Sequence, residues 1–377
     1  MNHMNQLALA HSPDVVPPEQ LEFRVSGDFW GVLDRCGSVL AVSREYENFI
    51  VLLGGAAGQP WQAPLPIPHP SGMFWNSSAQ ELIVASTRQL NQIFYFRLLN
   101  QEDLGSEILP TDFRTPPGDF LIPRSSVILP GSLYIHDIAM IRDELYATMT
   151  GHNFLGRIDR HGGWQRVWWP SLLDAQERGF SQNFFQLNSV ARADTVEGCF
   201  FTAFCDTSSG VKPWKAGFGP RERGVVFSAA SRQVHLRGLT CPHSARLIDG
   251  RLWLCNSGFG ETGFVESRSA GAEHVYRPIS QASGFTRGLA TLGDRYLAVG
   301  LSRVIPKYEP YAPGLVPEKT RCAVLILDRQ TGNEVASLEW KNGYQIYDIQ
   351  VMAGLKRPLL SHSVDGEPGN SAFRFFG

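Results

Sequence analysis

A pattern of three residues returns seven times along the chain, at intervals of 41 to 65 residues. Each copy has a polar or aromatic residue, then Gly, Ser or Asp, then an apolar residue, and a turn and a second apolar run follow it. The copies are Trp30–Val32, Ser71–Met73, His136–Ile138, Asn188–Val190, His243–Ala245, Arg287–Leu289 and Tyr347–Ile349. A repeat of this length with several short strands per unit is typical of a β-propeller, whose sheets surround a central channel. The sequence therefore predicts an all-β, seven-bladed β-propeller, with six blades as the alternative.

A propeller closes as one unit, so residues 21–377 are expected to form a single domain after a flexible N-terminal tail of residues 1–20. The last copy of the repeat lacks an outer strand. The run Leu21–Val25 is expected to join the blade that begins at Tyr347, because pairing the two ends of the chain removes an exposed sheet edge.

The second strand of each unit is a short run of β-branched, aromatic and small residues between turn formers. The expected second strands are Ser38–Val42, Glu81–Ala85, Glu144–Thr148, Cys199–Ala203, Arg251–Cys255, Arg295–Val299 and Pro358–Ser361. Such apolar strands indicate burial on both faces, as the stacking of blades requires.

The overall composition excludes several classes of partner. A net charge of −2 argues against nucleic acid and against an anionic membrane surface. No apolar run of 18 residues and no secretory signal is found. The six cysteines form no CxxC pair, which favours buried free thiols and a cytoplasmic location.

Five segments that overlap copies of the repeat carry a family resemblance: His136–Ala139, Leu187–Ala191, Pro242–Ser244, Gly284–Ala290 and Tyr347–Val351. With them, the chain from about Ser132 to Pro358 resembles an uncharacterised bacterial family, a domain of unknown function with a propeller-like repeat. The resemblance implies the fold and leaves the activity open. The chain departs from the family pattern at Ala245, where proline is common, and at Asn256, often an acidic position.

The residues that begin the innermost strands of a propeller meet at one mouth of its channel. The candidate catalytic residues are His136, His243, Asp137 and Asp348. The candidate substrate-binding residues are Asn188, Ser244, Arg246, Arg287, Tyr347, Trp214, Lys215 and Asn256. A divalent metal is possible through His136, His243 and His152, whereas no motif for a nucleotide or flavin is found.

Each candidate has a functional and a structural interpretation. The two imidazoles would act as general acid and base, and Arg246 or Arg287 would anchor an anionic group. Asp137 and Asp348 would either orient an imidazole or tether neighbouring blades by accepting backbone N–H bonds. Arg287 would either bind an anion or pair with a carboxylate of the core.

Two functions are compatible with these residues. The first is an enzyme of the lyase, hydrolase or isomerase type that acts on a small polar or anionic metabolite. The second is a non-catalytic propeller that binds a peptide or partner protein through aromatic mouth loops. Those loops, Asp206–Gly224 and Ser302–Lys319, carry Trp214, Tyr308 and Tyr311.

Overall fold

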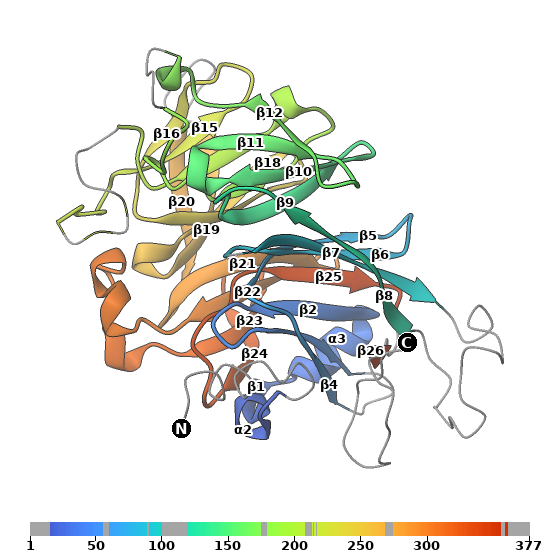
Figure 1. Ribbon diagram of the computed structural model, residues 1–377. Helices are drawn as coiled ribbons and strands as arrows, with labels where there is room; N and C mark the ends of the chain where they lie inside the picture. Colours follow the sequence, from blue (N-terminus) through green and yellow to red (C-terminus); the bar gives the residue numbers. More distant parts are fainter. Residues whose placement is uncertain are drawn as a thin grey trace, which may run out of the picture.

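The computed structural model describes residues 16–55, 60–88, 90–99, 120–174, 179–207, 213, 215, 217–267, 274–355 and 359–360. Within these residues the strands form six sheets whose innermost strands contact one another around a ring (Figure 1). The prediction of an all-β propeller is confirmed. The prediction of seven blades is wrong, and the alternative of six is correct.

We number the blades in chain order of their innermost strands and give each from the inside outward. Blade 1 contains β5 (Pro70–Asn76), β6 (Glu81–Ser86), β7 (Asn91–Leu99), β8 (Phe120–Leu129) and β26 (Leu359–Leu360). Blade 2 contains β9 (Ile135–Ile141), β10 (Glu144–Met149), β11 (Phe154–Ile158) and β12 (Trp164–Trp168). Blade 3 contains β13 (Ser189–Ala191), β14 (Phe200–Ala203), β15 (Gly224–Ser228) and β16 (Val234–Leu239).

The other three blades complete the ring. Blade 4 contains β17 (Pro242–Ile248), β18 (Arg251–Asn256), β19 (Glu261–Ser267) and β20 (His274–Gln281). Blade 5 contains β21 (Phe285–Leu292), β22 (Tyr296–Ser302), β23 (Cys322–Asp328), β24 (Glu334–Trp340) and β1 (Phe23–Gly27). Blade 6 contains β25 (Ile349–Ala353), β2 (Ser38–Arg44), β3 (Phe49–Gly54) and β4 (Trp61–Pro66).

The first copy of the repeat accounts for the missing seventh blade. Trp30–Val32 lies in the helix α3 (Phe29–Arg35), not in a strand. Asp28 caps this helix by accepting a hydrogen bond from the backbone N–H of Gly31 at 3.2 Å. The buried residues Phe29, Val32 and Leu33 have the spacing of one helical face, and this apolar stripe outweighs the resemblance to an inner strand.

The ring closes in a different way from the one predicted. The inner strand of blade 6 comes from the C-terminal part of the chain and pairs with β2, as in Val39 opposite Met352 (blue beside red in Figure 1). The N-terminal strand β1 pairs instead with β24 of blade 5, with Phe23 opposite Trp340. The expected closure of the Tyr347 blade by Leu21–Val25 is therefore wrong. Three N-terminal strands complete that blade.

Six of the seven expected second strands occupy that place in their blades. The exception is Pro358–Ser361, of which only Leu359–Leu360 is described. That pair forms β26, which runs parallel to β8 at the outer edge of blade 1. Of the predicted tail, residues 1–15 lie outside the described part, and Pro18–Leu21 forms the short helix α2.

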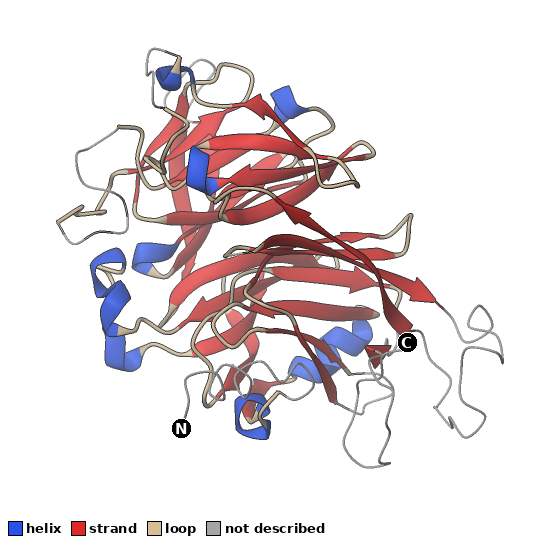
Figure 2. Cartoon of the chain, viewed as in Figure 1, coloured by secondary structure: helices blue, strands red, loops and turns tan. Residues whose placement is uncertain are grey.

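Helices are short and lie at the edges of the strand body (Figure 2). They include the 3-10 turns η2 (Thr150–His152), η3 (Ser171–Leu173), η4 (Val196–Gly198), η5 (Ser257–Phe259), η6 (Pro306–Tyr311) and η7 (Pro317–Lys319). None of the described helices is long and apolar enough to cross a membrane. All six cysteines are free, and five of them are buried. Burial raises the pKa of Cys255 to about 12, which leaves this thiol protonated near neutral pH.

The middle residue of the repeated pattern ties each blade to the next. Where it carries an oxygen, that oxygen accepts a backbone N–H from the following inner strand. The four bonds run from Val190 to Asp137 at 3.0 Å, from Ala245 to Ser189 at 3.0 Å, from Gly288 to Ser244 at 2.8 Å and from Met73 to Asp348 at 2.9 Å. At Gly72 the blades meet closely instead, since a Cβ there would lie 2.6 Å from the Cα of Asp137. The repeat is thus the signature of contacts between blades.

Candidate functional site

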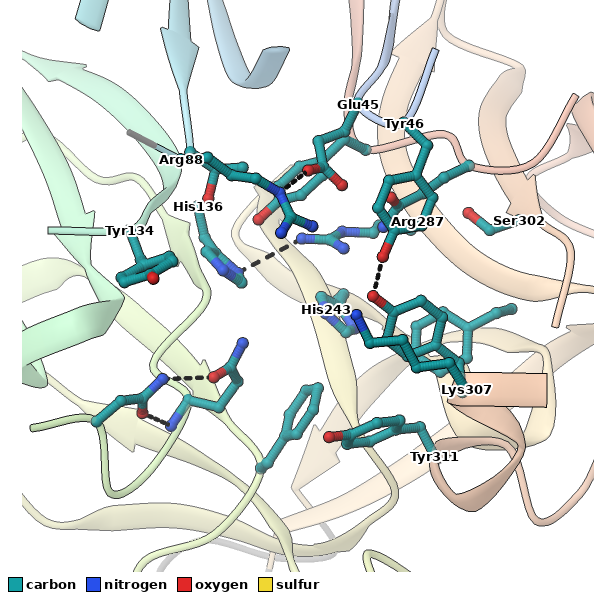
Figure 3. Close-up of a pocket in the computed structure, with 18 of the residues that line it drawn as sticks. Glu45, Tyr46, Arg88, Tyr134, His136, His243, Arg287, Ser302, Lys307 and Tyr311 are labelled. Carbon is teal, nitrogen blue, oxygen red and sulfur yellow. Dashed lines mark hydrogen bonds and ion pairs between the residues drawn. The ribbon is translucent and has the colours of Figure 1, made fainter. Parts of the chain in front are cut away.

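A cavity of about 640 Å³ opens at the mouth of the channel (Figure 3). Its walls come from two places in the blades: the segment that enters the innermost strand and the residues that follow the second strand. The first set contributes Ser132, Tyr134, His136, Gln186, His243, Phe285, Arg287, Tyr344, Gln345 and Tyr347. The second contributes Glu45, Tyr46, Thr87, Arg88, Gly151, His152, Phe204, Arg303, Lys307, Tyr308 and Tyr311. A volume of this size suits a small organic molecule.

Arg287 lies on the floor of the cavity and is only 7% exposed. Its guanidinium carbon lies 3.3 Å from the centre of the Tyr347 ring, and its Nη2 lies 3.5 Å from Nδ1 of His136. With the Gln345 amide oxygen turned toward Arg287, that oxygen accepts from Nη1 at 3.2 Å, and the amide nitrogen donates to Glu45 at 2.6 Å. No carboxylate of the described residues lies within 4.0 Å of Arg287. The guanidinium is therefore a buried cation held by neutral groups.

The imidazole of His243 is held on the same floor. Its Nδ1 lies 2.9 Å from the carbonyl oxygen of Cys241 and 3.1 Å from the hydroxyl of Ser257. The rings of Phe204 and Phe285 approach edge-on, with centroids 5.3 and 5.4 Å from that of the imidazole. These contacts from two sides fix the orientation of the ring.

Both floor histidines are neutral near pH 7. Burial, followed by the charge of Arg287, holds the pKa of His136 well below the usual 6.5. Burial, then Arg287 and His136, has the same effect on the pKa of His243. The floor thus offers two uncharged imidazoles beside a fixed positive charge.

The rim adds further charge and aromatic surface. Glu45 is buried and accepts from Nε of Arg88 at 2.6 Å. Although burial opposes it, hydrogen bonds from His69 and Arg88 hold the pKa of Glu45 below its usual value. The hydroxyls of Tyr46 and Tyr308 touch, with their rings stacked at 6.1 Å.

Cationic side chains outnumber acidic ones around the cavity. Among the described lining residues, Glu45 is the one carboxylate, against Arg88, Arg287, Arg303 and Lys307. Figure 3 shows the Lys307 side chain directed into the cavity. With neutral histidines, the net charge of the lining is positive.

The channel below the floor is closed by a different arginine. Arg246 Nη1 lies 2.8 Å from Asp137 Oδ2, and its Nη2 lies 3.0 Å from Asp348 Oδ1. Burial, opposed by Arg246, raises the pKa of Asp348 to about 6, and the neighbouring Asp137 contributes. No described imidazole bonds to either carboxylate, so the interpretation as blade tethers replaces that of orienting a histidine. Two carboxylates already neutralise the charge of Arg246, which disfavours its predicted role as the anchor of an anionic substrate.

The remaining candidates fall into three groups. Asn188 and Ser244 border the narrow space between the two arginines, where Asn188 accepts from Thr202 at 2.8 Å. Asn256 is buried away from the cavity and bonds to backbone and to Glu261. Lys215 is exposed and does not line the cavity, and Trp214 lies outside the described residues.

The predicted metal ligands are not assembled. His152 lines the cavity, but its Nδ1 lies 2.6 Å from the carbonyl oxygen of Phe180. In the described part of the chain no three His, Cys, Asp or Glu side chains are grouped so that they could hold a metal ion. Arg287, in contact with His136, also disfavours a second cation at this place.

Sequence reasoning missed Arg88, Tyr134, Lys307 and Gln345. Arg88 follows the end of β6 by two residues, as Tyr46 follows the end of β2. The register of the second strands could therefore have located Arg88. No comparable signal marks Gln345, because its role depends on the fold around it.

Fold and site together define a six-bladed β-propeller with a cationic, histidine-bearing cavity at one mouth. The chain belongs to the family described as a domain of unknown function, DUF4915, whose model matches residues 27–360. No curated protein matches the chain.

Several solved structures are similar to the chain. A chain of the nidogen/laminin complex is similar with a TM-score of 0.53 at 9% identity, covering 85% of this chain and all of that one. This similarity shows the fold alone. A gluconolactonase from Xanthomonas campestris has a TM-score of 0.46 at 13% identity, covering 81% of this chain and 86% of that one. A putative 6-phosphogluconolactonase from Bacteroides fragilis has a TM-score of 0.47 at 8% identity, with coverages of 84% and 98%. Neither of these two similarities bears on the chemistry of the site.

Proposed function

We propose that this propeller is an enzyme of the lyase, hydrolase or isomerase type that acts on a small anionic metabolite in the mouth cavity. The observation that carries the proposal is Arg287, a cation 93% removed from solvent with no carboxylate partner among the described residues. A buried charge without a counter-ion is costly, and a bound anion would supply the missing partner.

The two floor histidines supply acid–base chemistry beside that anchor. A neutral imidazole can take a proton from a bound molecule, and the charge of Arg287 stabilises the negative charge that develops. Phe204, Phe285 and Tyr347 line this part of the cavity, and a ligand that displaces water beside these rings would strengthen both interactions.

A second candidate function rests on the aromatic rim. Tyr134 and Tyr344 line the cavity and are 47% and 50% exposed, and such side chains are frequent anchors for a peptide or partner protein. A propeller that binds a peptide would use this rim and would leave the floor histidines without a chemical role.

The test is a screen of small anionic metabolites by thermal melting, followed by turnover measurements. His243→Ala and Arg287→Ala should each lower turnover by about 10²-fold or more, the scale of one general acid–base contribution. His274→Ala, on the outermost strand β20, is the control and should keep full turnover.

Two results would remove the proposal. Full turnover in both floor variants would place the reaction elsewhere. A peptide that binds the wild type and is lost on Tyr344→Ala, with no metabolite shifting the melt, would favour the binding module.

A further inference from the structure

The hydrogen bonds of the two floor histidines fix different tautomers. A carbonyl oxygen can only accept, so Nδ1 of His243 must carry the proton that it donates to Cys241 at 2.9 Å. The Ser257 hydroxyl donates its own proton to the carbonyl of Thr286 at 2.6 Å and can accept from the same Nδ1–H. In the neutral ring, Nε2 of His243 is then an acceptor with a free lone pair.

His136 has the opposite arrangement. A guanidinium can only donate, so Nδ1 of His136 is the acceptor for Nη2 of Arg287 at 3.5 Å. In the neutral ring the proton is then on Nε2. No described residue hydrogen-bonds to Nε2 of either histidine, although both rings line the cavity. The cavity therefore presents one acceptor and one donor, with Arg287 at the same floor.

We infer that the ligand carries a hydroxyl beside its anionic group, and that this hydroxyl donates to Nε2 of His243 while it accepts from Nε2–H of His136. A single hydroxyl is both donor and acceptor, so it satisfies the two histidines at once. The inference rests on the proposed function and narrows its substrate class to small hydroxy acids and related hydroxylated anions.

The same arrangement defines a proton transfer. The O–H bond of the ligand breaks, His243 Nε2 gains the proton and becomes imidazolium, and the electron pair stays on the oxygen. His136 Nε2–H and the charge of Arg287 then face the resulting alkoxide. The step needs no further reactant, and return of the proton restores the neutral imidazole.

The tautomers can be measured directly by long-range ¹H–¹⁵N NMR of the histidine rings at pH 7.5. The expected result is protonated Nδ1 in His243 and protonated Nε2 in His136. The same tautomer in both rings would overturn the inference without touching the role of Arg287 as an anion anchor.

Binding of two probes tests the hydroxyl. Mandelate and phenylacetate share a carboxylate and a ring that suits the aromatic wall, and they differ by one hydroxyl. Calorimetry should give about tenfold tighter binding of mandelate to the wild type, the scale of one buried hydrogen bond.

Two matched variants sharpen the result. In His243→Asn the side-chain amide can still donate toward Cys241, but the Nε2 acceptor is lost. In His136→Asn the side-chain oxygen can still accept from Arg287, but the Nε2 donor is lost. Each variant removes one of the two hydrogen bonds to the hydroxyl, so in each the preference for mandelate over phenylacetate should fall below that of the wild type. A melt confirms folding, and if one variant does not fold, the other and the NMR result decide.

The outcomes distinguish failure of the hydroxyl inference from failure of the proposed anion site. If Arg287→Met weakens both probes and the wild type does not distinguish them, the anion site stands and the hydroxyl inference fails. If Arg287→Met leaves the binding of both probes unchanged, or if neither probe binds the wild type at millimolar concentration, the inference and the anion site both fail.

Discussion

Two arginines from neighbouring blades lie in the same channel but have different kinds of partner. Arg246 of blade 4 joins two buried carboxylates, Asp137 of blade 2 and Asp348 of blade 6. Arg287 of blade 5 lies nearer the mouth and is held by an amide, an imidazole and an aromatic ring. The charge of Arg246 is compensated by carboxylates of the protein, whereas no described carboxylate lies within 4.0 Å of Arg287. Under the proposed function, the arginine whose carboxylate partners lie within the protein is structural, and the one without such a partner binds the ligand.

The largest expected effect is a loss of stability when Arg246 is replaced. Arg246→Met should lower the free energy of unfolding by about 3–5 kcal/mol, because it leaves Asp137 and Asp348 buried without their shared cation. Arg287→Met serves as the matched control and should unfold close to the wild type, since no carboxylate depends on it. Urea titration of both variants measures the difference, and equal losses of stability in the two would contradict the different roles assigned to Arg246 and Arg287.

The second expected effect is a loss of the stabilisation by a bound anion when Arg287 is replaced. Sulfate at 100 times its dissociation constant should stabilise the wild type by about 2.7 kcal/mol through binding to the folded state. Arg287→Met should retain only the general salt effect that sulfate has on any protein. Melts in sulfate and in chloride of equal ionic strength check this, and an unchanged sulfate response in Arg287→Met would contradict the proposed anchor.

The smallest expected effect is the pH dependence of stability that arises from His136 and His243. The pKa values of His136 and His243 lie well below 6.5 in the folded protein, so the unfolded chain binds more protons below that pH. The stability contribution is therefore fully present above pH 6.5 and is lost as the pH falls below it, by up to about 1.4 kcal/mol per pH unit for each histidine. Unfolding between pH 5 and 7.5 should show a shallower slope in the double variant His136→Asn/His243→Asn. An identical slope would mean that folding does not lower the pKa of the two imidazoles.

The repeat predicted six inner strands correctly because its middle residue lies where neighbouring blades meet, and in four of the six it accepts a backbone N–H from the next blade. The prediction was wrong at Trp30, because a capping aspartate and an apolar stripe at helical spacing favour a helix over the inner strand that the three-residue pattern predicts. The wrong number of blades also made the predicted ring closure wrong. The blade that begins at Tyr347 is completed by β2, β3 and β4, so it has no place for Leu21–Val25.

The candidate residues at the mouth were found by the same periodicity. His136, His243, Arg287 and Tyr347 occupy equivalent places in the repeat and line one cavity. Their equivalence in sequence did not predict their chemistry. Asp137 and Asp348 looked like partners for a histidine, and Arg246 looked as suitable as Arg287 for an anion.

By itself, then, the sequence determined that the chain forms a propeller and which residues begin its inner strands, because both follow from local periodicity and turn chemistry. Only the tertiary structure decided which buried arginine has a counter-ion, which nitrogen of each histidine carries the proton, and that Glu45 and Gln345 join the same network. These properties depend on distances between blades that are far apart along the chain. The burial that shifts the histidine pKa values arises only when all six blades close around the channel.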